Sequence, residues 1–225
     1  MTSGLPTPYS VHVFEEVTST QDVARKIFRE RPVVVIAGRQ TAGRGREGSA
    51  WQNAPRALAV TAAFGLGSSP LWSLASLVAG LSAAEVLGQQ VWLKWPNDLL
   101  IGDGKVGGVL VEVIGQIVAV GCGLNLWWPE APAGRTALFP EDPGRGPEVG
   151  LGVAIAEELF QRLAGPEWGA DEYRTRCLTL GRPITWSGGQ SGFARDIDSV
   201  DGSLLVELDG GGLVRLNAGE VRHIR

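Results

Sequence analysis

The chain has 225 residues, of which 44% are hydrophobic and 20% are charged, and its formal net charge is −4 at pH 7. This composition is ordinary for a globular protein, and the length allows one substantial core plus a small appended module. The net negative charge disfavours a general nucleic-acid-binding protein, which needs a basic footprint, so we expect no DNA partner. No apolar run is long enough to span a membrane, and the start lacks a signal-peptide pattern. We therefore expect a cytoplasmic protein whose two cysteines, Cys122 and Cys177, are reduced thiols.

The first part of the chain predicts strands and helices in mixed order. Apolar and polar residues alternate over 11–17, which predicts a strand, and Ser19 and Thr20 offer N-caps for a helix to about residue 30. The β-branched run 33–37 predicts a buried strand. Further strands are predicted at 57–64, 91–95, 99–101, 106–113 and 117–126, and helices at 71–87, 149–163 and 167–177. Because strands and helices do not alternate regularly, we expect an α+β fold with a mixed sheet.

The end of the chain has a different texture. A segment rich in proline and glycine, 127–150, predicts a long loop that could be a disordered insertion. After Gly181, short strands are separated by glycine-containing turns, which is typical of a small all-β barrel. We place the domain boundary near Leu178, giving domains 1–177 and 178–225.

The loop 38–53 contains the pattern G-x-G-x-x-G at residues 43–48. In a dinucleotide-binding fold this pattern opens a helix, but here the next predicted element is a strand, so we reject that interpretation. The alternative is a mobile loop that binds an anion through Arg44 and Arg46, because guanidinium groups form paired hydrogen bonds to phosphate or carboxylate. A solvated surface loop with incidental arginines explains the pattern equally well.

Three later stretches could carry chemistry. Lys94-Trp95-Pro96-Asn97-Asp98 offers oxygen ligands for Mg²⁺ and a cation for phosphate, although it is also good turn chemistry. Lys105 is either a fixed cation in a pocket or a hairpin lysine in water; it is not in a P-loop, because Val106 follows where Ser or Thr is required. The alternating glycines in 121–125 leave room for a flat ligand, and Cys122, with no adjacent base, is expected to be a small buried residue.

Taken in order, these stretches resemble the biotin–protein ligase family. The motifs are G-R-G-R-x-G-x-x-W at 43–51, K-W-P-N-D at 94–98, G-K-x-G-G-x-L-x-E at 104–112 and G-x-G-x-N at 121–125, within a match over roughly 17–125. The resemblance implies the class II synthetase-like biotin–lipoate ligase fold, with a C-terminal SH3-like barrel. It also implies two chemical steps: biotin and Mg·ATP give biotinyl-5′-AMP and pyrophosphate, and a lysine of a biotin carboxyl carrier protein then displaces AMP.

The resemblance assigns roles to residues at matching positions. Lys105, Arg46 and Asp98 are the implied catalytic residues, and Asn97 and Asp98 the implied Mg²⁺ contacts. The implied biotin contacts are Ser19, Thr20, Gln21, Gln40, Gly43, Arg44, Gly45, Arg46, Lys105, Gly108, Gly121 and Gly123. The implied ATP and adenylate contacts are Arg44, Arg46, Trp51, Lys94, Asn97, Asp98, Lys105 and Asn125.

Several features depart from the family or leave alternatives open. Gln21 replaces the usual Asn, and Glu47 and Ser49 leave the loop with less positive charge than is common in the family. The residues before Ser19 are too few for a helix-turn-helix, so we expect a ligase without repressor function. Family members are often dimers, but the sequence does not locate a dimer surface. The alternatives are a lipoate or octanoate ligase or transferase of the same fold, and a non-catalytic biotin-binding regulator.

Overall fold

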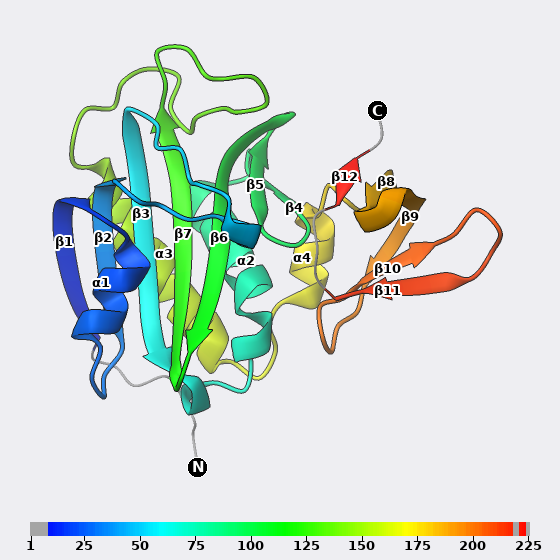
Figure 1. Ribbon diagram of the computed structural model, residues 1–225, viewed down its shortest axis with the longest axis horizontal. Helices are drawn as coiled ribbons and strands as arrows, with labels where there is room; N and C mark the ends of the chain where they lie inside the picture. Colours follow the sequence, from blue (N-terminus) through cyan, green and yellow to red (C-terminus); the bar gives the residue numbers. More distant parts are fainter. Residues whose placement is uncertain (1–8, 218–220, 224–225) are drawn as a thin grey trace.

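The structure, a computed structural model, describes residues 9–217 and 221–223. The expectations of no signal peptide and no helix-turn-helix fall partly on residues 1–8, which lie outside the described residues. Figure 1 shows a large sheet with helices on both faces and a smaller β module beside the strand β4. Among the described residues, no helix has both the length and the apolar character needed to cross a bilayer.

The large sheet has seven strands in the order β1-β2-β3-β7-β6-β5-β4. β1 pairs with β2 in parallel and the other neighbours are antiparallel, which confirms the predicted mixed sheet. The strands are β1 (Ser10–Val17), β2 (Val33–Gln40), β3 (Arg56–Gly65), β4 (Trp92–Lys94), β5 (Asp98–Ile101), β6 (Gly104–Ile114) and β7 (Ile117–Trp127).

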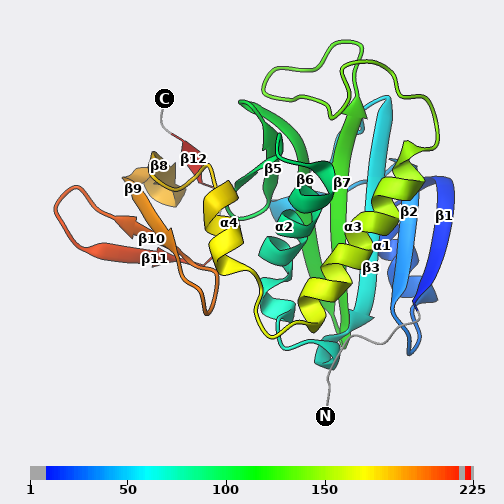
Figure 2. The ribbon, with the colours of Figure 1, turned by 180° about the vertical axis from the view of Figure 1, so that it is seen from behind.

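Four helices accompany the sheet, namely α1 (Thr20–Ile27), α2 (Ala75–Leu87), α3 (Pro147–Ala164) and α4 (Ala170–Arg176). Figure 2 shows α2 and α3 across one face, and α1 lies on the other. Successive side chains of β2 point to opposite faces of the sheet, so the strand packs against helices on both sides. Val34 and Ile36 join the core under α2 and α3, whereas Val33 and Val35 pack with Ala24 of α1.

Three helices differ from the sequence-based predictions by three or more residues at one end. α1 ends at Ile27 because Phe28 has extended backbone angles. α2 begins at Ala75, after a separate 3-10 turn at Trp72–Leu74. α4 begins at Ala170 because Gly169, with φ of 89°, takes a left-handed conformation that starts the helix anew.

The antiparallel hairpins bring the predicted glycines together. Gly102, with φ of 56°, makes the tight β5–β6 turn. In the β6–β7 hairpin, Gly108 lies opposite Gly123 and Leu110 lies opposite Gly121. Two motifs that are separate in the sequence therefore form one continuous patch of small residues.

The C-terminal module is a five-stranded antiparallel sheet in the order β11-β10-β9-β8-β12. Its strands are β8 (Pro183–Trp186), β9 (Gln190–Ile197), β10 (Leu204–Glu207), β11 (Leu213–Leu216) and β12 (Arg222–His223). The module shares its buried core with the large sheet, and the indole Nε1 of Trp95 donates to the Gly202 carbonyl at 3.0 Å. The boundary at Leu178 stays a prediction, because packing is continuous across it.

Candidate functional site

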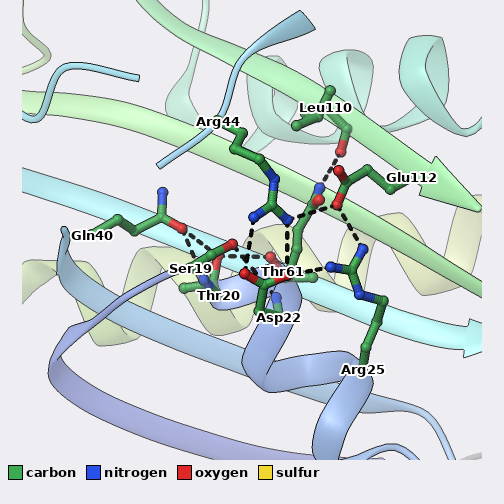
Figure 3. Close-up of polar contacts among 10 residues, drawn as sticks. Ser19, Thr20, Asp22, Arg25, Gln40, Arg44, Thr61, Leu110 and Glu112 are labelled. Carbon is green, nitrogen blue, oxygen red and sulfur yellow. Dashed lines mark hydrogen bonds and ion pairs between the residues drawn. The ribbon is translucent and has the colours of Figure 1, made fainter. Parts of the chain in front are cut away.

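A small polar cavity lies where α1 begins and β2 ends. Ser19, Thr20 and Gln21 are buried there because Ser19 is the N-cap of α1, which turns the next two side chains toward the sheet. The Thr20 backbone N–H and hydroxyl both donate to Gln40 Oε1, at 2.8 and 3.1 Å. The Thr61 hydroxyl in turn donates to the Thr20 hydroxyl at 2.8 Å, as Figure 3 shows. The start of α1 and the end of β2 are thereby tied into one wall.

The glycines of β6 and β7 line the same cavity. A Cβ at Gly121 would lie 2.7 Å from Gln21 Nε2, and a Cβ at Gly123 would lie 2.9 Å from the Trp51 indole. Neither distance is tolerable for real atoms, so the close approach of Gln21 and Trp51 to the strands requires glycine. The glycines therefore make room for the Gln21 and Trp51 side chains against the strands, and the flat ligand expected there stays a prediction.

Two buried polar atoms in this wall have no partner among the described residues. Gln21 donates through Nε2 to the Leu110 carbonyl at 2.7 Å, but its Oε1 accepts nothing, and Trp51 Nε1 donates to nothing. Buried polar atoms are nearly always paired, so unpaired atoms at a cavity mark positions that a water or a ligand can complete. The cavity is only about 30 Å³, enough for one or two waters. A larger ligand therefore requires Trp51 or its loop to move.

A second, larger cavity of about 520 Å³ adjoins the first and shares Arg44, Trp51, Gly108 and Leu110 with it. Its walls include Arg46, Asn97, Asp98 and Lys105. Lys105 Nζ is paired with Asp98 Oδ1, and Arg46 donates to Asn97 Oδ1 at 3.1 Å. The loop of 43–51 thus covers a cavity rich in cations that opens from the small polar one.

The glycine- and arginine-rich loop does not open a helix. Arg46–Gly48 forms one 3-10 turn, residues 49–55 are not helical, and β3 follows. The rejection of a dinucleotide-binding fold is therefore confirmed.

Arg44 fastens this loop to the rest of the protein. Its guanidinium donates to both carboxylate oxygens of Asp22 on α1, at 2.9 and 3.0 Å, and to Glu112 of β6 at 3.0 Å. Arg25 pairs with the same two carboxylates, completing a four-residue cluster in Figure 3. Arg44 lines both cavities, but its charge is directed at protein carboxylates.

The Asp22 carboxyl predicts a pH dependence for this cluster. The hydrogen bond from Arg44 lowers the pKa of Asp22 from its ordinary value of 3.8. Because the folded-state pKa is lowered, the stabilisation is present above the ordinary value and is lost as the pH falls through the lowered one. We expect Asp22→Asn to reduce the free energy of unfolding at neutral pH and to flatten its decline in acid.

Urea denaturation across a pH series measures this effect. Asp103→Asn, in the exposed β5–β6 turn, is the matched control and should follow the unchanged protein. Parallel pH profiles for Asp22→Asn and the unchanged protein would contradict the role given to Asp22.

Comparison with known proteins decides the family. The model of the biotin/lipoate A/B protein ligase family matches residues 13–125. The chain belongs to this family. Two curated relatives are named biotin–[acetyl-CoA-carboxylase] ligase. The one from Mycobacterium tuberculosis is 36% identical, over 86% of this chain and 79% of the relative. The one from Paracoccus denitrificans is 32% identical, over 78% and 83%.

Solved structures of biotin protein ligases have the same fold. The Aquifex aeolicus protein in complex with biotin and ATP has a TM-score of 0.82 at 24% identity, covering 96% of this chain and 99% of that one. The Leishmania major protein in complex with biotin has a TM-score of 0.62 at 26% identity, covering 92% and 98%. The predicted α+β ligase fold with a small C-terminal module is thereby confirmed.

For this biotin/lipoate ligase-family protein, three of the site residues implied by the resemblance, Lys94, Asn125 and Gly43, line neither cavity. Asn125 is fully buried, and its side chain binds the protein backbone rather than facing a cavity. Its Nδ2 donates to the carbonyls of Lys105 and Thr136 at 3.2 and 3.1 Å. Lys94 and Asn125 can support the site only through their neighbours in this conformation. Gly43 is buried between Gln40 and Trp51, and the other implied residues line one or both cavities.

The implied Mg²⁺ contacts fit unequally. Asn97 Oδ1 accepts a hydrogen bond from Arg46. The oxygen that would bind a metal is therefore already occupied. Asp98 supplies one carboxylate in the larger cavity, and Mg²⁺ is often held by one or two carboxylates together with substrate phosphates and water. Within the described part of the chain, no cluster of three or more His, Cys, Asp or Glu side chains could hold a metal ion. The role of Asp98 toward Mg²⁺ stays a prediction.

Sequence reasoning missed three residues at the site. Glu112 belongs to the third motif but received no role, and Asp22 was not singled out. Arg135 lines the larger cavity from the segment 127–150, which we expected to be a long loop. Only the folded chain brings that segment back to β6, where Lys105 bonds to it through its backbone.

Cys122 lines the small cavity and offers a direct test of its closure. Burial raises the pKa of its thiol to about 12, so the thiolate is scarce. We expect iodoacetamide to leave Cys122 and Cys177 unmodified in the folded protein and to modify both in denaturant, as read by mass spectrometry. Rapid labelling of folded Cys122 would show that the cavity opens freely.

Proposed function

We propose that the protein joins biotin to a lysine of a biotin carboxyl carrier protein, using ATP to activate the biotin carboxylate. The observation that carries this proposal is the junction of the two cavities. A small cavity with unpaired hydrogen-bonding atoms opens directly into a larger one lined by Arg46 and Lys105. Relatives that cover most of the chain are named biotin ligases, which favours biotin over lipoate as the substrate.

Once Trp51 or its loop moves to enlarge it, the small cavity suits the ureido ring of biotin. A ureido group has two N–H donors and one carbonyl acceptor, and the unpaired Gln21 Oε1 can accept from one of those donors. Ser19 and Thr20 supply hydroxyls beside it. The extra methylene of Gln21, relative to the usual Asn, is accommodated because Gly121 has no side chain. The carboxylate tail then extends toward Lys105.

In the first step, a biotin carboxylate oxygen attacks the α-phosphorus of ATP. The bond from that phosphorus to the bridging oxygen breaks, and pyrophosphate leaves with the electron pair. Both reactants are anions, so Lys105 and Arg46 act by stabilising the charge that gathers as they meet. Asp98 would hold Mg²⁺ in this cavity, and the ion would add neutralisation of the triphosphate charge.

In the second step, a lysine amine of the acceptor attacks the carbonyl carbon of the mixed anhydride, and AMP leaves. Asp98 lies at the same cavity and is the proposed acceptor of the amine proton. The loop of 43–51, held over the cavity by Arg44, excludes water from the anhydride between the two steps.

A labelling assay with purified components tests the proposal. The protein is incubated with biotin, ATP, Mg²⁺ and a purified carrier domain, and the carrier is weighed by mass spectrometry. We expect a gain of one biotinyl group that requires ATP. No gain on the carrier, with biotin bound normally, would favour the non-catalytic regulator.

Calorimetry separates biotin from lipoate. We expect biotin to bind and lipoate not to bind, because a lipoyl ring has no ureido group for Gln21, Ser19 and Thr20. Binding of lipoate alone would reverse the choice of substrate. A homodimer and a cytoplasmic location remain predictions, and light scattering of the purified protein tests the first.

A further inference from the structure

The segment after β7 returns to the larger cavity and pairs with the start of β6. The Lys105 backbone N–H donates to the Gly134 carbonyl at 2.9 Å, and the Thr136 N–H donates to the Lys105 carbonyl at 3.0 Å. These two bonds form a parallel bridge between Lys105 and Arg135. Asn125 secures the bridge, because its side-chain amide donates to the carbonyls of both Lys105 and Thr136.

The bridge determines where the Arg135 side chain points. Bridged residues on neighbouring strands direct their side chains to the same face of a sheet. Lys105 directs its ammonium into the larger cavity, and Arg135 lines that cavity as well. Two positive side chains therefore lie next to each other on one wall.

The cations of this cavity differ in how they are paired. Arg44 is bound to two carboxylates, Lys105 is paired with Asp98, and Arg46 donates to Asn97. Among the residues that the structure describes, none accepts a hydrogen bond from the half-buried Arg135 guanidinium, and no carboxylate pairs with it. An uncompensated guanidinium beside a second cation attracts an anionic ligand.

We propose that Arg135 is a nucleotide-binding residue whose guanidinium takes phosphate oxygens of ATP, next to the phosphate that Lys105 contacts. The loop of 43–51 has Glu47 and Ser49 where family members often carry basic residues. Arg135 adds positive charge to the same cavity from the segment after β7. This inference rests on the proposed ligase function. It assigns a substrate contact to a segment outside the four sequence motifs.

The test compares Arg135→Met with the unchanged enzyme in biotin-dependent exchange of pyrophosphate into ATP. Loss of a charge-assisted hydrogen bond to phosphate is expected to raise the KM for ATP about 10-fold. Calorimetry should show biotin binding unchanged within about twofold. Arg135→Lys keeps a charge and should restore a large part of the ATP affinity.

A matched control lies on the same segment. Arg145 is exposed and pairs with Glu15 at 2.8 Å, away from the cavity, so Arg145→Met should leave the KM for ATP unchanged. Two inhibitors locate the contact: Arg135→Met should weaken inhibition by inorganic pyrophosphate and leave inhibition by adenosine unchanged.

The outcomes separate this inference from the proposed function. An Arg135→Met enzyme with an unchanged KM for ATP would overturn the role of Arg135, as would equal losses of biotin and ATP affinity, which indicate a structural role. Weaker inhibition by adenosine alone would overturn the assignment to phosphate. Absence of exchange in the unchanged enzyme would instead overturn the proposed function.

Discussion

Replacing Lys105 with alanine is expected to slow formation of biotinyl-adenylate by about 100- to 1,000-fold, the usual effect of removing one preorganised donor to a developing charge. Lys105 reaches the larger cavity from the start of the strand β6 and is paired there with Asp98. Without the ammonium, the biotin carboxylate and the α-phosphate approach each other with less compensation, and the Asp98 carboxylate adds an uncompensated negative charge. The effect should fall mainly on kcat.

Biotin-dependent pyrophosphate exchange measures this rate. Lys26→Ala, which removes an exposed lysine of α1 that lines neither cavity, is the matched control and should exchange at the normal rate. The thermal unfolding midpoint of Lys105→Ala should stay close to that of the unchanged protein, because Lys105 is only partly buried. Normal turnover by Lys105→Ala would remove the electrostatic role proposed for it.

The second large effect is expected from Gly121→Ala. The added methyl would lie 2.7 Å from Gln21 Nε2 and would force that amide away from the Leu110 carbonyl. Overfilling a packed site by one carbon costs about 1–3 kcal/mol, which corresponds to a biotin affinity about 5- to 150-fold weaker. Because the atom that must move, Gln21 Nε2, is at the end of a flexible side chain, the protein itself should fold normally.

Calorimetric titration with biotin measures the loss, and titration with ATP should be unaffected. Gly150→Ala is the matched control, since a Cβ at Gly150 meets nothing within 4 Å. Equal biotin affinity in Gly121→Ala and the unchanged protein would place the ureido ring elsewhere.

Much of the architecture follows from local patterns. The β-branched run in β2, the glycine turns of the hairpins and the capping Ser19 each act over a few residues, so they predicted strands, turns and a helix start correctly. Helix ends were less predictable. The start of α4, for example, depends on the left-handed Gly169, which propensity alone does not reveal.

The sequence by itself determined the motifs and therefore the chemistry that we propose: glycines where a ligand approaches backbone, and cations where two anions meet. Only the tertiary structure decided how those groups are paired. Arg44 turned toward Asp22 and Glu112, and Arg135 arrived beside Lys105 from a segment with no periodic pattern. The physical reason is that motif spacing reports local geometry, whereas ion pairs and strand bridges form between groups that the fold, not the chain order, makes neighbours.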